Sequence, residues 1–385
     1  MRFLVGMVLF LALLSCASTN VAPHQTGSRP EATSDEAGLW MIMDKAEEDL
    51  KTSSQVERDA QLNQYIREVT CRVVTDDACK DLRIYVIKEN NFNASMAPNG
   101  MMLIHTGLLL RMENEAQLAY IIGHEFAHFY HRHSLEIFRH RKNVETATLA
   151  LRMISIGSQP TDLLKQSYLQ LTQTIYAFSR KAEREADAGG FHLMQRAGYD
   201  PYQAAEAWIY LMQEISASSS KRKKEREARA SAYRTHPLTQ DRVRTLFALA
   251  ETHQGESYLG LDAYKTATTP FLEEWLDHDL VRRDLGEHLF LINHLLERGG
   301  AKGVLWYRKG EAYRIRRKAG DQERALAAYQ RAIQFIDAPA RTYREIGHLE
   351  RRFRRHDAAK TAYQEYLRLY PNAPDRPLIE IYILH

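Results

Sequence analysis

Residues 124–128, His-Glu-Phe-Ala-His, have the residue types and the spacing of a metal-dependent hydrolytic site. Residues 113–130 contain no proline and carry apolar residues at helical spacing, which predicts a helix. His124 and His128 then lie one turn apart on one face, where two imidazoles can bind one zinc ion. With only three protein ligands, a coordination place remains for a water whose pKa falls to about 7, and Glu125 can act as its general base. The alternative is a surface helix on which this spacing occurs by chance, because the chain carries 16 histidines.

A third ligand is therefore required, and the helical region expected at residues 160–197 offers one. Glu183 and Asp187 are four residues apart and share a helix face. Glu183 would complete a His-His-Glu zinc site, and Asp187 would accept a hydrogen bond from the distal nitrogen of a ligand imidazole, which fixes its tautomer. Glu185 is expected to point elsewhere. The alternative is an amphipathic helix whose Arg–Glu pairs, with Glu185 among them, lie on its solvated face.

More histidines follow the first motif, at positions 131, 133 and 140. His131 lies seven residues after His124 and so near the same face, but one or two turns further along. It is out of reach of the same ion unless the helix bends. We expect it beside the site or on the surface.

A small sheet is predicted immediately before the metal-binding helix. Residues 82–88 alternate and are rich in β-branched types, which indicates a strand. Asn99 and Gly100, between two short apolar runs, predict a hairpin. An exposed edge strand there could hold an extended peptide by main-chain hydrogen bonds, although a hairpin with a purely scaffolding role has the same pattern.

Three motifs occur in one order: HEFAH at 124–128, SRKAEREADAGG at 179–190 and THPLTQDRV at 235–243. Together they resemble the HtpX/BepA-type zinc metallopeptidases, a gluzincin family, over residues 38–250. The segment at 96–109 also resembles the family's segment ahead of the metal helix.

The resemblance implies roles for individual residues. The two motif histidines and Glu183 would bind zinc, and Glu125 would be the catalytic acid and base. His236 is similar to a family histidine near the metal, which either stabilises the oxyanion of the transition state or caps the zinc in a latent state. Arg242 is expected to brace the site through a carboxylate. The polar segment at 216–235 is a candidate for a mobile plug over the site, as in BepA-like proteins.

The amino terminus has the features of an export signal. An apolar run at residues 3–14 follows a basic residue, is too short to span a bilayer, and ends in Leu-Leu-Ser-Cys. This resembles a bacterial lipobox, so we expect a signal peptide at 1–15 and acylation of Cys16, which would anchor the protein in a membrane. In the lipoproteins that this segment resembles, a residue other than Asp after the cysteine, here Ala17, favours the outer membrane over the inner one. An ordinary cleaved signal is the alternative, and residues 16–38 are expected to form a flexible tether.

Cys71 and Cys79 remain once Cys16 is assigned to lipidation. In an oxidising compartment an even pair most simply forms one disulfide, here closing a loop between a helix at about 41–73 and the first strand. Two buried free thiols are the alternative.

The last third of the chain contains a repeat with an offset of 34 residues. Three positions recur in it: Ala325, Tyr329 and Ala332 return as Ala359, Tyr363 and Tyr366. The copies resemble tetratricopeptide repeats, with about three extra residues in the first copy at 316–320. An apolar helix at 280–296 is expected to supply a neighbouring layer, and the concave surface would bind a protein segment. The basic run at 351–355 is expected to be a solvated helix face.

Length and charge limit the remaining choices. The chain has 385 residues, 44% of them hydrophobic, and its 52 basic side chains nearly balance 49 acidic ones, so no nucleic-acid partner is expected. The predicted fold is mainly α-helical with a small β-sheet (α+β). A zincin-like metallopeptidase domain at 39–250 precedes a linker at 251–275 and a helical repeat domain at 276–385.

The predicted function is zinc-dependent endoproteolysis at the outer membrane, facing the periplasm of a Gram-negative-type bacterium. By the resemblance, the polypeptide substrates are misassembled outer-membrane proteins, with chaperone-like help in their assembly and the assembly machinery as a candidate partner. The alternative is a lipid-anchored scaffold or chaperone whose metal site is idle or structural. The intact Glu125 argues against it, because a structural zinc site needs no carboxylate beside it.

Overall fold

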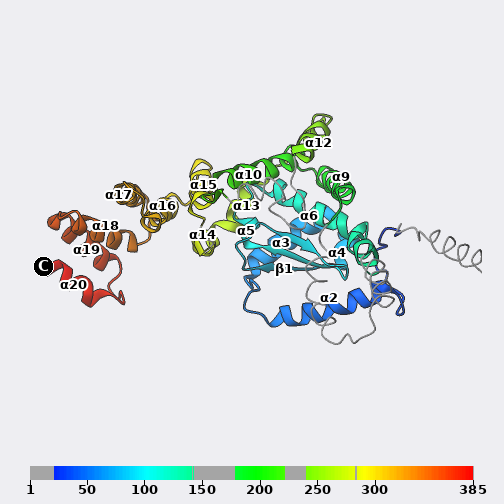
Figure 1. Ribbon diagram of the computed structural model, residues 1–385, viewed down its shortest axis with the longest axis horizontal. Coiled ribbons are helices and arrows are strands. Elements are labelled where there is room, and N and C mark those ends of the chain that lie inside the picture. The colour runs from blue at the N-terminus through cyan, green and yellow to red at the C-terminus, as the bar shows by residue number, and fades with distance from the viewer. Residues whose placement is uncertain (1–20, 141, 143–177, 222–239, 282–283, 385) are drawn as a thin grey trace, which may run out of the picture.

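A computed structural model describes residues 21–140, 142, 178–221, 240–281 and 284–384 (Figure 1). Helices dominate this part of the chain and surround one three-stranded sheet, which confirms the predicted α+β fold. None of the helices in these ranges is both long and apolar enough to cross a bilayer. The predicted lipidation site Cys16 and the predicted site residue His236 lie outside the described residues.

The sheet has the strand order β1-β3-β2, with β1 at Arg83–Ile87, β2 at Ala94–Met96 and β3 at Met101–His105. β1 runs parallel to β3, and β2 pairs with β3 as the predicted antiparallel hairpin. Gly100 in the turn has φ +86°, and a Cβ atom on it would lie 2.7 Å from the backbone oxygen of Asp81. Only glycine fits this turn without strain.

Helices cover both faces of the sheet, because apolar side chains alternate along β1 and β3. Tyr85 and Leu103 pack toward α2 (Asp35–Thr52), which lies along one face (Figure 1). Val86 and Ile104 point the other way, into the main core beneath α3 (Ala60–Val74) and α6 (Glu115–Tyr130).

The single helix expected at about 41–73 is wrong, because residues 53–59 separate α2 from α3. Val56 forms an antiparallel bridge with Ile87, and the Glu57 N–H donates to the Val86 carbonyl at 2.8 Å. This extended segment thus pairs with the edge of β1. Asp59 then restarts the helix as an N-cap.

A disulfide joins Cys71 and Cys79, whose Cα atoms are 5.1 Å apart. Cys79 lies on the five-residue helix α4 (Asp76–Lys80), which precedes the first strand. The bond therefore closes the connection between α3 and β1, in which the short helix α4 lies.

Two long helices, α6 and α9 (Arg180–Arg196), cross at glycines. A Cβ atom on Gly190 would lie 2.7 Å from the backbone nitrogen of His124, and one on Gly123 would lie 3.0 Å from the Gly190 carbonyl oxygen. The backbones can approach this closely only because both positions lack a side chain. Of the helical region expected at 160–197, the structure describes residues from 178 onward.

The segment at 251–275, expected to be a linker, is largely helical and belongs to the main core. Tyr264 and Trp275 on it are each 2% exposed, and they pack in the same cluster as the buried residues of α6. Between α9 and residue 300, the described helices are α10 (Gln203–Ala217), α12 (Gln240–Ala250), α13 (Leu261–Thr268), the 3₁₀ helix η1 (Thr269–Phe271), α14 (Leu272–Val281) and α15 (Leu285–Glu297).

An arm of five helices follows and extends away from this body (Figure 1). Its helices are α16 (Lys302–Arg316), α17 (Asp321–Ala332), α18 (Arg341–Arg352), α19 (His356–Leu369) and α20 (Arg376–Leu384). The first four form two helix pairs. In the first pair a Cβ atom on Gly310 would meet the Tyr329 ring at 2.3 Å, and in the second one on Gly347 would meet the Tyr363 ring at 2.5 Å. The two pairs thus repeat one packing arrangement.

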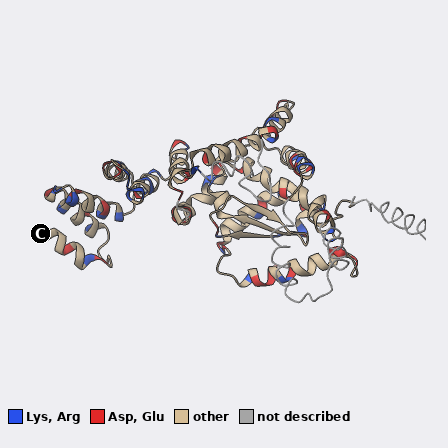
Figure 2. Ribbon diagram, in the orientation of Figure 1, with Lys and Arg blue, Asp and Glu red and all other residues tan. Residues whose placement is uncertain are grey.

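Acidic and basic residues occur on the same helices of the arm (Figure 2). In the basic run at 351–355, Arg351 lies over the Tyr382 ring at 4.1 Å, and the Arg355 Nε is 2.9 Å from a Glu350 carboxylate oxygen. These two guanidinium groups are engaged within the arm itself. The expected neighbouring layer is α15, which packs against α16 on one side and α10 on the other.

Candidate metal centre

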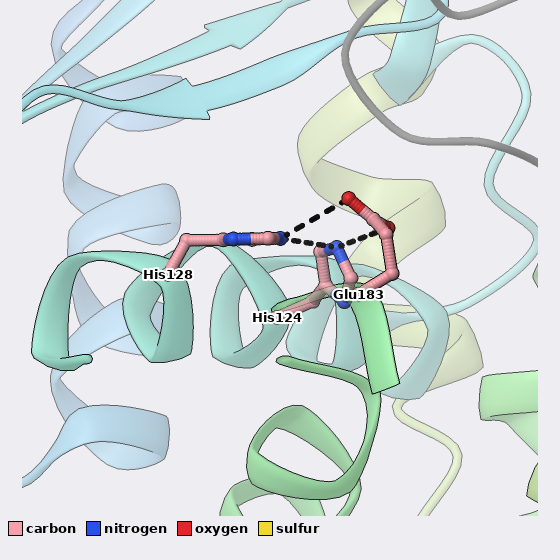
Figure 3. Close-up of side chains that lie close together, drawn as sticks. All are labelled: His124, His128 and Glu183. Atoms are coloured by element: carbon pink, nitrogen blue, oxygen red, sulfur yellow. Dashed lines mark hydrogen bonds and ion pairs between the residues drawn. The ribbon is translucent and has the colours of Figure 1, made fainter. Parts of the chain in front are cut away.

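His124, His128 and Glu183 converge in the core where α6 crosses α9 (Figure 3). The Nε2 atoms of the two histidines are 3.2 Å apart. The Glu183 carboxylate oxygens lie 3.7 Å from the His124 Nε2 and 3.6 Å from the His128 Nε2. All three residues are 1–2% exposed. The structure therefore brings together the three ligands expected from the sequence, from segments about 55 residues apart.

This donor set fits a zinc ion. Bonds of about 2.0–2.1 Å at tetrahedral angles would place the donor atoms about 3.3 Å from one another, close to the separations found here. Two imidazole nitrogens and a carboxylate are the ligands of catalytic zinc sites that keep an open position. Three electron-rich groups this close in a buried place repel one another, and a cation between them removes that repulsion.

Asp187 holds His124 from the far side of the ring. One of its oxygens is 3.2 Å from the His124 Nδ1 and accepts a hydrogen bond of 2.8 Å from the Tyr120 hydroxyl. With the His124 proton on Nδ1, the lone pair of Nε2 faces Glu183. The Trp208 indole N–H donates to the Tyr120 oxygen at 3.1 Å and so fixes that hydroxyl in turn.

Arg242 on α12 connects the carboxylates. Its guanidinium donates to both oxygens of Asp187, at 2.7 and 2.6 Å, and lies 2.9 Å from an oxygen of Glu183. Burial alone would raise the pKa of Asp187, but the Arg242 charge and the hydrogen bond with His124 outweigh it and hold that pKa well below its ordinary value. Asp187 is therefore ionised. Arg242, 5% exposed, touches carboxylates as expected from the sequence.

Residues 57–250 match the profile of Peptidase family M48, which covers half of the chain. The chain belongs to peptidase family M48. Its mitochondrial metalloendopeptidase OMA1 relative from Schizosaccharomyces pombe is 31% identical over 185 residues, 47% of this chain and 51% of that protein. OMA1 from Arabidopsis thaliana is 35% identical over 119 residues, 31% of this chain and 23% of that protein.

The β-barrel assembly-enhancing protease of Escherichia coli K12 is 25% identical over 202 residues, 50% of this chain and 40% of that protein. The chain thus spans about half or less of the length of these curated relatives. The matched residues 57–250 include both α6 and α9, at whose crossing the three candidate ligands lie.

Glu125 of this M48 domain follows the first ligand directly on α6 and is 4% exposed. A buried carboxylate beside a metal site is suited to proton transfer. His236 was the other residue expected to act on substrate. It lies outside the described residues, as does most of the segment expected to plug the site.

Sequence reasoning assigned no role to His133, whereas Glu185 lies half-exposed on α9, as expected. The His133 Nδ1 is 2.9 Å from the His128 Nδ1, and its Nε2 is 3.2 Å from a Glu185 oxygen. Burial lowers the pKa of His133 in spite of Glu185, which favours the neutral ring. Glu185 also lies 3.7 Å from Lys181, as a solvated pair would, but it reaches the site through His133. His131, for which a place beside the site or on the surface was expected, stacks on His133.

Proposed function

We propose that this M48 protein is a zinc-dependent endopeptidase. The observation that supports this most directly is the convergence of His124, His128 and Glu183 in a buried place beside Glu125. A structural zinc site usually has four protein ligands, whereas three ligands next to a carboxylate suit hydrolysis.

The chain's own residues would divide the work of hydrolysis. A zinc ion held there would polarise a peptide carbonyl and lower the pKa of a water molecule. Glu125 accepts a proton from that water as its oxygen attacks the carbonyl carbon. The C–N bond then breaks, and Glu125 returns the proton to the leaving nitrogen, which balances the reaction. Asp187 and Arg242 hold the ligands in place throughout.

Misfolded or misassembled outer-membrane proteins are the proposed substrates, and the periplasmic side of the outer membrane is the proposed location. The lipobox-like sequence before Cys16 supports a lipid anchor in a bacterial envelope. One relative is named for β-barrel assembly, and the relatives named OMA1 are mitochondrial. We propose that the two helix pairs of the arm are tetratricopeptide-like repeats that bind the substrate or the assembly machinery, with a chaperone-like role.

A scaffold or chaperone with an idle metal site is the second candidate function. The repeated helix pairs favour it, because stacked pairs of this kind present extended binding surfaces. The buried site next to Glu125 favours the peptidase.

The Glu125→Gln substitution separates the two functions. Using protein that lacks residues 1–16, we expect Glu125→Gln to keep one zinc per chain and to cleave casein or an unfolded β-barrel protein about 10²–10⁴-fold more slowly than wild type. Glu136→Gln, which changes an exposed glutamate after α6, is the matched control and should cleave normally. Equal cleavage by wild type and Glu125→Gln would contradict the proposal, and absence of zinc from the wild type would contradict the site itself.

A further inference from the structure

The two histidine ligands are held by different partners on their far sides. The His124 Nδ1 meets a carboxylate directly, at 3.2 Å from Asp187. The His128 Nδ1 meets another histidine, with His133 at 2.9 Å, and His133 in turn meets Glu185 at 3.2 Å. The orientation of the His128 ring therefore depends on two residues in succession, His133 and then Glu185.

The direction of the protons in this chain follows from the chemistry of imidazole. A histidine that presents a lone pair on Nε2 carries its proton on Nδ1. The His128 Nδ1–H can donate to His133 only if the His133 Nδ1 has a lone pair. The His133 proton then lies on Nε2, where the Glu185 carboxylate accepts it. Glu185 thus selects the tautomer of His133, and His133 selects that of His128.

The local backbone explains why His133 can do this. On a continuous helix, His133 would lie about 140° around the axis from His128 and point away from it. Arg132 adopts φ +55°, however, which ends α6 and returns the chain toward the site. His133 is 2% exposed as a result, and the Phe178 ring stacks on the face of the His128 ring, with the ring centroids 3.8 Å apart.

We propose that His133 and Glu185 are positioning residues for His128, which hold its ring so that Nε2 points at the metal. This rests on the proposed zinc site. Residues that orient a ligand imidazole typically contribute 10–100-fold to metal affinity. Helix α9 would then supply one ligand, Glu183, and both of the carboxylates that orient the two histidines, Asp187 and Glu185.

The test is zinc affinity, measured by competition with a chelator on protein lacking residues 1–16. We expect His133→Leu to bind zinc about 10–100-fold more weakly than wild type. His133→Asn should recover most of that loss, because its amide oxygen can accept from the His128 Nδ1–H in the place of the lost nitrogen. Glu185→Leu should cause a smaller loss, since its side chain is 42% exposed and water can replace it.

His131→Leu is the matched control, because it removes a neighbouring histidine that stacks on His133 but is not a member of the chain from His128 through His133 to Glu185, and it should leave zinc affinity unchanged. Urea unfolding of each metal-free variant shows whether the fold is intact. The visible spectrum of the cobalt-substituted protein should change in His133→Leu and not in His131→Leu, because only the first alters the ligand field.

Wild-type zinc affinity in a folded His133→Leu protein would overturn the positioning role, as would failure of His133→Asn to bind better than His133→Leu. These outcomes leave the peptidase proposal intact. A wild-type protein that takes up no zinc would instead contradict the proposed function.

Discussion

At the scale of single residues, the site is a cluster of charged side chains buried in the core. Glu183 and Asp187 bring two negative charges into the core, and Arg242 brings one positive charge. These three side chains leave one net negative charge, which a divalent cation held by the two histidines would more than offset. Arg242 also lies over the Trp208 ring at 4.7 Å, which fixes the plane of its guanidinium group.

Replacement of Arg242 by methionine should therefore destabilise the protein strongly. Removal of one partner leaves two carboxylates buried together, so we expect the free energy of unfolding to fall by about 3–5 kcal/mol in urea titrations of the metal-free protein. Arg244→Met on the same helix is the control: its side chain is 75% exposed, and the change should stay below about 0.5 kcal/mol. Similar losses in both variants would show that Arg242 has no special role.

At the scale of elements, the site exists because two helix backbones nearly touch. Gly190 and Gly189 on α9 face α6, where a Cβ atom on Gly189 would lie 2.7 Å from the Ala127 Cβ. On α6, Gly190 meets the backbone of His124, and Gly189 meets Ala127, which lies between the two histidines in sequence. The distance between the helices thus sets the distance from Glu183 to the histidines.

Gly190→Ala should push the two helices apart. The new methyl group would meet backbone atoms of His124, which cannot rotate away, so we expect a loss of about 1–3 kcal/mol in stability together with weaker zinc binding in chelator competition. Gly38→Ala in α2 is the control, since nothing lies within 4 Å of its added methyl group. Alanine there should be neutral or stabilise the helix by up to about 1 kcal/mol. A Gly190→Ala protein with normal zinc affinity would refute this account of the crossing.

At the scale of the whole molecule, buried charges join the metallopeptidase body to the helices before the arm. Arg111, whose side chain is fully buried, binds Glu214 on α10 and Asp279 on α14, each at 2.6 Å. His288 on α15 binds the other oxygen of Asp279 at 2.7 Å. Helices α13 to α15 are therefore part of the folded body, although the family profile ends at residue 250.

Truncation should reveal this boundary. A fragment of residues 21–300 keeps the whole network, so we expect it to be soluble and to unfold cooperatively. A fragment of 21–250 leaves Arg111 and Glu214 without Asp279 and uncovers the core around them, so it should aggregate or unfold at far lower urea concentration. Size-exclusion chromatography and urea titration measure both properties. Equal stability of the two fragments would place the boundary at residue 250 instead.

Much of the fold was accessible from local patterns. The metal-binding helix, the first strand and the hairpin at Gly100 follow from periodicity and turn residues, which act over a few neighbouring positions. The break between α2 and α3 was missed because it depends on pairing of Val56 with β1, a contact between segments about 30 residues apart. The packing of residues 251–275 was missed for the same reason, since burial of Tyr264 depends on surfaces supplied by distant segments.

At the site, the residue types and their spacing can be read from the sequence: two histidines one turn apart, a carboxylate between them, and two acidic residues four positions apart on a later helix. These are properties of helix geometry and ligand chemistry. The folded chain alone fixes the contact between His133 and His128, because the left-handed backbone conformation of Arg132 turns the chain back at the end of α6. It also decided that Glu185 reaches His133 across two helices, since that contact depends on how closely α6 and α9 approach at their glycines.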